Sequence, residues 1–260
     1  MWPSVLGGPP SGLDVHWGIR RSRSADRGLG QPDGGTSQLS VLYVIATPIG
    51  NLDDLSARAI AVLGTVRIAA VEDTRVTSRL LARHGLRPTL ISHRAPVEGR
   101  SLGRLLDALE SEDIALVSDA GTPTLSDPGQ RLIDAAWKNG HRVIPIPGPS
   151  AITAALAVAG FPGPGFTFVG FLPRKPSHLR ALFESIRDQE RLTVAFDSPY
   201  RILKSLAVLN AVLPERQVAV GREMTKIHEE VIRGTAAEVV AAIGARNRGE
   251  FTLVIAGSKP

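Results

Sequence analysis

From about residue 41 onward, short apolar runs alternate with amphipathic segments along the chain. Short runs of β-prone residues are typical of strands that are buried on both faces of a parallel sheet. In the first half of the chain they predict strands at residues 41–46, 66–71, 89–92, 114–117 and 142–146. Apolar residues at helical spacing predict helices at residues 55–63, 74–84, 102–109 and 131–139. Alternating strands and helices indicate an α/β domain with right-handed crossovers.

A second unit follows a junction that is rich in proline and glycine. Residues 145–149 and 162–165 flank one apolar helix, expected at 151–159. Beyond it we expect strands at 167–171, 191–196, 217–220, 230–232 and 251–256, and helices near 178–187, 201–212 and 236–244. The close spacing between residues 217 and 232 favours antiparallel pairing, so the second sheet should be mixed. We therefore predict an α/β protein with an N-terminal domain at 41–148 and a C-terminal domain at 149–260.

Composition adds limits to this picture. Residues 1–40 are rich in Gly, Pro, Ser and Arg without apolar periodicity, and we expect a disordered tail there. The sequence has no cysteine, which excludes disulfides and thiolate-bound metals. No apolar run approaches the roughly 20 residues that span a bilayer, and no secretory signal is present, so we expect a soluble, cytoplasmic protein. Of the 30 basic residues 25 are arginine, which suits phosphate binding but also follows from a GC-rich genome.

The loop after residues 114–117 is the strongest candidate for a binding site. It holds small and polar residues in quick succession, namely Ser118, Asp119, Gly121, Thr122 and Pro123. Open α/β sheets bind ligands at the carboxyl ends of their strands, where such loops let a ligand approach closely. Asp127 and Pro128 are expected to start the next helix, and an ordinary strand-to-helix turn is the alternative to a binding loop. Dinucleotide and phosphate-loop glycine motifs are absent, as is metal-ligand spacing, so we expect a small polar ligand without a pyrophosphate and no metal.

Six short motifs, taken together and in order, carry a family resemblance. They lie at residues 46–54, 70–75, 117–123, 147–151, 170–173 and 222–226. The set resembles the ribosomal RNA small subunit methyltransferase I family, within the tetrapyrrole methylase superfamily, over about residues 42–257. The turn Ala46-Thr-Pro-Ile-Gly-Asn51 replaces the glycine-richer turn of porphyrin and corrin methylases, which favours the RNA branch.

This resemblance implies an S-adenosyl-L-methionine-dependent enzyme that methylates the ribose 2′-hydroxyl of a decoding-centre cytidine. Its partners would be 16S rRNA or the small ribosomal subunit, and a second copy of itself in a homodimer. The cofactor would lie in the cleft between the two domains. The resemblance places it against Pro48, Gly50, Ser118, Asp119, Gly121, Thr122, Pro123, Thr153, Ala154, Asp197 and Gly234.

Methyl transfer to a ribose hydroxyl needs a proton acceptor and accurate positioning, but no metal. Asp73 and Arg75, at the end of the second strand, and Glu223 and Lys226, in the second domain, are the candidate catalytic residues. The alternative role of Asp73 is to cap the next helix. For Glu223 and Lys226 the alternative is a surface ion-pair cluster. A noncatalytic RNA- or ribosome-binding protein and a small-molecule methylase remain alternative functions.

Arginines recur along the second predicted helix. Arg75, Arg79 and Arg83 are four residues apart and form one stripe, while Val76 and Leu80 should face the core. The stripe starts beside the candidate catalytic residues, so we expect it to bind RNA phosphates together with Arg222. A solvated helix face is the alternative.

Overall fold

The computed structural model describes residues 40–94 and 98–258, so the expected tail lies outside it except for Ser40. The first five-stranded sheet has the order β3-β2-β4-β1-β5, and every pair in it is parallel. Its strands are β1 (Val41–Ile45), β2 (Ile68–Val71), β3 (Thr89–Ser92), β4 (Ile114–Val117) and β5 (Arg142–Ile146). Its helices are the short 3-10 helix η1 (Leu52–Asp54), then α1 (Ala57–Leu63), α2 (Thr74–Arg83), α3 (Glu98–Leu109) and α4 (Gln130–Lys138).

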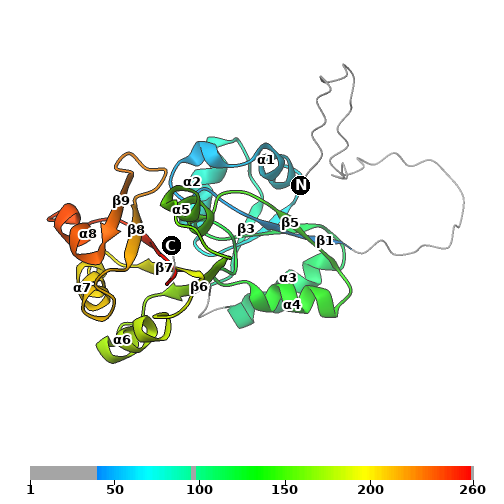
Figure 1. Cartoon of the computed structure of the whole chain (residues 1–260). Coiled ribbons are helices and arrows are strands. Elements are labelled where there is room, and N and C mark those ends of the chain that lie inside the picture. The colour runs from blue at the N-terminus through cyan, green and yellow to red at the C-terminus, as the bar shows by residue number, and fades with distance from the viewer. Residues whose placement is uncertain (1–39, 95–97, 259–260) are drawn as a thin grey trace, which may run out of the picture.

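The period-two alternation of the strands divides the first core into two layers (Figure 1). Tyr43 and Val117 point toward α1 and α2, whereas their neighbours Leu42 and Leu116 point toward α3 and α4. Because both faces are covered, these strands contain almost no polar residue. A ligand can therefore reach the inner strands of this sheet at their ends, but not across either face.

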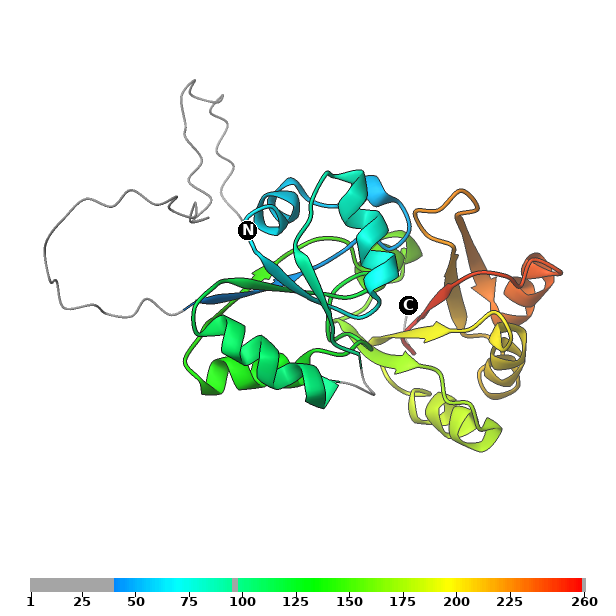
Figure 2. The same cartoon turned by 180° about the vertical axis from the view of Figure 1, so that it is seen from behind.

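The second sheet has the order β6-β7-β10-β8-β9 and is mixed, as predicted: β6 and β7 are parallel, and the remaining pairs are antiparallel. Its strands are β6 (Phe166–Phe171), β7 (Leu192–Asp197), β8 (Gln217–Arg222), β9 (Glu230–Thr235) and β10 (Phe251–Ile255). Helices α6 (Pro176–Ser185), α7 (Ile202–Val212) and α8 (Ala236–Ile243) cover one face, and α5 (Ala151–Ala159) covers the other. Figure 2 shows the two α/β units side by side, and the change between them falls at residues 147–150, after β5.

Two local predictions were wrong. Helix α4 begins at Gln130, after Gly129, and not at Asp127 and Pro128. Gly129 has φ +124°, and a Cβ there would lie 2.7 Å from the Leu116 side chain, so the chain needs glycine to turn into the helix. In α2, Val76 is 40% exposed and Thr77 takes the buried position before Leu80.

A hairpin loop of the second sheet reaches the first domain. The loop joins β8 to β9, and the hydroxyl of its Thr225 accepts the Asn51 N–H at 3.1 Å. Gly50 makes this approach possible, because a Cβ there would lie 2.5 Å from Lys226 Cγ and 2.8 Å from Thr225 Oγ1. Glycine at this position therefore lets the two domains meet beside the strand ends.

We expect Gly50→Ala to separate this contact and to lower the free energy of unfolding by about 2 kcal/mol, the usual cost of overpacking. Urea unfolding, with limited proteolysis of the hairpin loop, measures the effect. Gly103→Ala in α3 is the control. An added Cβ there meets nothing within 4 Å, so alanine at this exposed helix position should raise the free energy of unfolding by up to about 1 kcal/mol. Unchanged stability and proteolysis in Gly50→Ala would show that the hairpin does not press on this turn.

Candidate functional site

Two loops at the carboxyl ends of β1 and β4 are fastened together. Thr47 and Gly121 exchange backbone hydrogen bonds of 2.9 and 3.0 Å. The Thr47 hydroxyl also donates to the Ser118 carbonyl at 3.1 Å. The turn at residues 47–51 and the loop at residues 118–129 therefore form one rigid platform.

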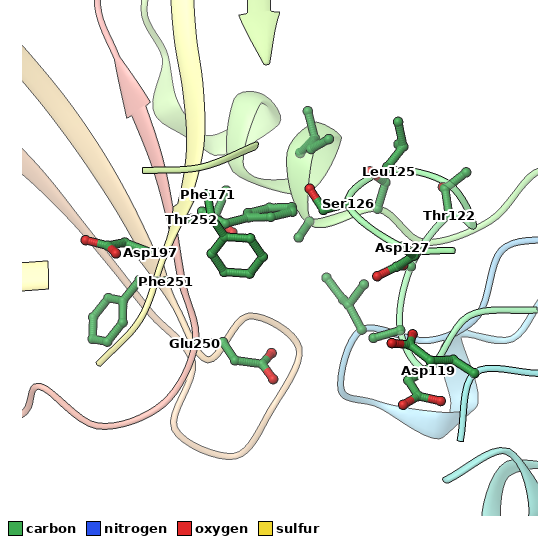
Figure 3. A pocket seen from close by; sticks show the side chains of 18 residues that line it. Asp119, Thr122, Leu125, Ser126, Asp127, Phe171, Asp197, Glu250, Phe251 and Thr252 are labelled. Atoms are coloured by element: carbon green, nitrogen blue, oxygen red, sulfur yellow. The ribbon is translucent and has the colours of Figure 1, made fainter. Parts of the chain in front are cut away.

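A cavity of about 320 Å³ lies between this platform and the near end of the second sheet (Figure 3). The residues that line it come from both domains: Ile49, Glu72, Asp119, Ala120, Gly121, Thr122, Leu125, Ser126, Asp127, Ser150, Ala151, Ile152, Phe171, Phe196, Asp197, Glu250, Phe251 and Thr252. Its volume lies in the range of small-molecule sites. Most of the first-domain lining is the strand-end loop that the sequence singled out, and Ile49 and Glu72 complete it.

Charge gives the cavity its chemical character. Among the described residues that line it, five carry a carboxylate and none is Lys, Arg or His. In Figure 3, Asp119 and Asp127 lie on one side of the cavity and Glu250 on the other. Such a lining favours a cation and disfavours a polyphosphate, because a like charge in a partly buried site is costly.

The carboxyl groups on the platform side hold their protons more tightly than usual. Burial, followed by the nearby charge of Glu72, raises the pKa of Asp127 to about 6. Burial is also the largest cause that raises the pKa of Glu72 and of Asp119. Carboxyl groups whose pKa lies closer to neutrality are better suited to accept and return protons.

Asp73 and Arg75, two of the candidate catalytic residues, are bound to each other at the rim of the cavity. Asp73 caps α2 by accepting the Arg75 N–H at 2.8 Å, and its other carboxylate oxygen lies 2.6 Å from Arg75 Nη2. The hydrogen bonds from Arg75 hold the pKa of Asp73 well below its usual range. Asp73 is therefore a weak proton acceptor, and its capping role is the one that the geometry favours.

Glu223 and Lys226, the other two candidates, belong to a charge cluster that reaches the cavity through Glu250. Lys226 Nζ lies 3.0 Å from carboxylate oxygens of both Glu223 and Glu250, and the Glu250 N–H donates to Glu223 at 2.9 Å. Burial raises the pKa of Glu223, but the hydrogen bonds from Lys226 and Glu250 outweigh it and leave the pKa lowered. Burial lowers the pKa of Lys226, but its two carboxylates outweigh burial, so the pKa is raised and the lysine stays charged.

The positions expected to bind the cofactor fall into three groups. Asp119, Gly121, Thr122 and Asp197 line the cavity. Others support it from behind or beside it, namely Pro48, Ser118 and Pro123, which are buried in the platform, Gly50, which meets the hairpin loop, and Thr153 and Ala154, which follow the lining residues 150–152. Gly234 is remote, because it pairs with Val218 at the end of the sheet opposite Arg222.

Asp197 lines the cavity, but its carboxylate turns away from it. Alternation along β7 puts Phe196 on the α5 side, and Figure 3 shows Asp197 directed away from Asp119. The buried carboxylate lies 2.7 Å from Arg201 at the start of α7 and accepts the Ser198 N–H at 2.8 Å. Asp197 thus holds the chain at the beginning of α7.

Several lining residues were not predicted. Glu250 stands in no motif and reaches the cavity only through the pairing of β10, which sequence periodicity does not specify. Leu125 and Ser126 lie in the loop that the sequence singled out, where Thr124 and Ser126 have φ of +75° and +73°. Backbone strain of this kind collects at functional sites. Phe171 lies in one of the six motifs, and that was its only signal.

Neither a candidate metal centre nor a membrane span is found in the described part of the chain. Within residues 40–94 and 98–258, no group of three His, Cys, Asp or Glu side chains could hold a metal ion. None of the helices in the same part of the chain is long and apolar enough to cross a membrane.

Solved structures and a family model identify the class. The methyltransferase CobJ has a TM-score of 0.62 at 18% identity and covers 84% of this chain and 95% of its own. Diphthine synthase has a TM-score of 0.60 at 17% identity and covers 83% of this chain and 89% of its own. The family model for tetrapyrrole (corrin/porphyrin) methylases matches residues 41–240. The fold is that of a tetrapyrrole methylase, and the chain belongs to this family.

Relatives in sequence narrow this class. Ribosomal RNA small subunit methyltransferase I of Thermotoga maritima is 40% identical over 84% of this chain and 99% of its own length. The protein of the same name from Xylella fastidiosa is 43% identical over 84% and 81%, and that of Micromonospora olivasterospora 42% over 92% and 78%. The chain belongs to the ribosomal RNA small subunit methyltransferase I family.

The raised pKa of Asp127 predicts a pH-dependent stability. Since the folded-state pKa of about 6 exceeds the ordinary value of 3.8, this group costs stability that sets in above pH 4 and is complete above pH 6. Asp127→Asn should therefore raise the free energy of unfolding by about 1 kcal/mol at pH 7.5, allowing for partial exposure, and not at pH 3.5.

Urea unfolding at the two pH values measures this effect. Asp107→Asn on α3, away from the cavity, controls for the removal of one negative charge. An equal change at both pH values, or an equal change in the control, would contradict the assigned cause.

Proposed function

We propose that this protein uses S-adenosyl-L-methionine to methylate the ribose 2′-hydroxyl of a decoding-centre cytidine in 16S rRNA. The observation that carries the proposal is a cavity lined by carboxylates, placed between the two domains of a fold whose relatives bear the name ribosomal RNA small subunit methyltransferase I. The substrate is 16S rRNA or the small ribosomal subunit, and the protein acts as a homodimer.

The cavity suits the cofactor in size and charge. S-adenosyl-L-methionine carries an ammonium group and a sulfonium group, and the latter supplies the methyl group. Asp119 and Glu250 offer carboxylates to such positive charges from opposite sides, while Gly121 and Ser150–Ile152 let a ligand approach the backbone closely. The aromatic ring of Phe196 provides the apolar surface that an adenine ring requires.

Proton transfer is assigned to the platform side of the cavity. The 2′-hydroxyl must lose its proton during transfer, and Asp127, whose pKa is raised to about 6, is the carboxylate proposed to accept it. The pKa values of Glu72 and Asp119 are also raised, so these two carboxyl groups can share the proton with Asp127. Asp73 is the weaker candidate because Arg75 already occupies its carboxylate.

RNA docking is assigned to the rim. Phosphates are repelled from a cavity lined by carboxylates, so the RNA backbone should stay outside and present only one ribose. Along α2, Arg75 is paired with Asp73 and Arg83 lies 3.2 Å from Asp53, and none of the ion pairs in the described part of the chain involves Arg79. Surface pairs such as these are weak and exchange readily for a phosphate.

Arg222 is less available than the sequence suggested. Its Nε donates to the Arg248 carbonyl at 2.8 Å, and its Nη1 lies 3.6 Å from Glu230. Its side chain is largely buried, so it orders the base of the β8–β9 hairpin. The α2 stripe is therefore the main phosphate surface in this proposal.

Cofactor binding and methyl transfer test the proposed function. Calorimetry should show S-adenosyl-L-methionine binding, and purified small subunits should gain a labelled methyl group that maps to a cytidine ribose. Absence of cofactor binding, both with and without RNA, would contradict the enzyme hypothesis and would favour a noncatalytic RNA-binding protein. Transfer to a porphyrin precursor instead of RNA would establish a small-molecule methylase.

A salt titration tests the docking surface. Arg79→Ala with Arg83→Ala should weaken binding to RNA or small subunits and flatten the salt dependence by about two units of slope, roughly one per phosphate contact. Cofactor affinity should stay unchanged. The matched control is Arg67→Ala with Arg142→Ala, which removes the same charge at the amino ends of β2 and β5. Equal salt slopes in the two double variants would place the docking surface elsewhere.

A further inference from the structure

Strand β6 contains one residue more than its pairing with β7 requires. Phe168 pairs with Val194, and the next pair joins Phe171 to Phe196, three steps along β6 but two along β7. Gly170, inside this irregular stretch, has φ +70°, which glycine adopts without strain. The strand therefore carries a β-bulge just before it ends at the cavity.

The bulge decides where Phe171 points. Phe168 packs on the α5 side of the sheet, and Val169 packs on the opposite side, against the core of α6, α7 and α8. Regular alternation would place Phe171 with Val169, inside that core. The extra residue brings it to the other side, where its ring lies 5.5 Å from that of Phe196 in an edge-to-face arrangement.

This placement leaves an aromatic ring open to solvent at the mouth of the cavity. Phe171 is 58% exposed although it lines the cavity. Across from it lies the strained loop of the first domain with Leu125, which is 41% exposed (Figure 3). The two walls are close, since a Cβ on Gly170 would lie 3.7 Å from Ser126 Oγ. Phe171 and Leu125 thus form two apolar walls of the cavity, and the space between these two side chains is called the slot below.

We propose that Phe171 is the platform on which the nucleobase of the target nucleotide stacks, with Leu125 on the facing side of the slot. This inference rests on the proposed function and specifies how the ribose is positioned. Unpaired bases in RNA are recognised by stacking on aromatic side chains, because every base has an apolar face. A base held in the slot leaves its negative phosphates outside and turns its ribose toward the carboxylates.

The nucleobase of the RNA fits this position better than the adenine of the cofactor. A cofactor ring that is held for the whole reaction is expected deep in a pocket, where most of its surface is buried. Phe171 stands at the entrance, with more than half of its surface exposed to solvent. Phe196, farther inside and beneath Phe171, is the ring left for the cofactor.

The experiment compares four single variants. Phe171→Ala and Phe171→Leu remove the flat ring, the second keeping most of the apolar contact with Phe196. Phe171→Trp keeps a stacking surface. Phe166→Ala is the matched control, because Phe166 is 43% exposed on the same strand but does not line the cavity. Each variant is measured for melting temperature, cofactor affinity by calorimetry, and kcat and KM of methyl transfer to small subunits.

We expect Phe171→Ala and Phe171→Leu to lose about 10-fold or more in kcat/KM, the usual effect of removing one stacking ring. Cofactor affinity and melting temperature should match the parent, Phe171→Trp should retain the activity, and Phe166→Ala should behave like the parent. A subunit reconstituted with an abasic residue at the methylated position should be a poor substrate for the parent. Phe171→Ala should suffer no further loss on it.

Two results overturn the inference while the proposed function stands. Full activity in Phe171→Ala and Phe171→Leu would show that no base stacks there. Loss of cofactor affinity in both would assign the ring to the adenine instead. If the parent itself transfers no methyl group to RNA, the proposed function fails and the stacking role falls with it.

Discussion

The site depends on keeping several carboxylates close together in a partly buried space. Burial is the largest cause that raises the pKa of Glu72, Asp119 and Asp127, and repulsion by neighbouring carboxylates adds to it. The fold tolerates the repulsion because backbone groups are fixed around it: Asp119 accepts the Asp73 N–H at 2.9 Å, and the Thr47–Gly121 pair anchors its loop. A cation in the cavity relieves the same repulsion, so the cost of the empty arrangement becomes affinity for a positive ligand.

Charge is sorted by depth in this protein. Carboxylates line the cavity, whereas Arg75 and Lys226, which do not line it, are each paired with a carboxylate. A negative polymer and a positive small molecule can then meet at one place without either crossing a surface of its own charge. Neither domain provides this arrangement alone, because Glu250 comes from the second domain, whereas Glu72, Asp119 and Asp127 come from the first.

Sequence periodicity predicted the order and type of the helices and strands, since buried strands and amphipathic helices each leave a local signature. The loop at residues 118–123 was singled out because small and polar residues follow a buried strand, and it lines the cavity. What failed or was missing depends on pairing between distant segments. Glu250 reaches the cavity through β10, and the direction of Phe171 depends on a bulge measured against β7. Asp197 was placed correctly along the chain, but alternation turns its carboxylate toward Arg201. The predicted helix start at Asp127 was wrong because α4 begins only after Gly129, where Leu116 leaves no room for a Cβ.

Glu250 serves two neighbours at once. Its carboxylate lines the cavity and also lies 3.0 Å from Lys226, on the hairpin loop that rests against Gly50. A positive ligand that draws on Glu250 weakens its hold on the lysine, and a phosphate that draws on the lysine frees Glu250 for the ligand. Under the proposed function the two binding events would be thermodynamically linked through Glu250, and by reciprocity each would strengthen the other to the same degree. Because one carboxylate is shared, the affinity for each ligand would then be highest when the other ligand is already bound.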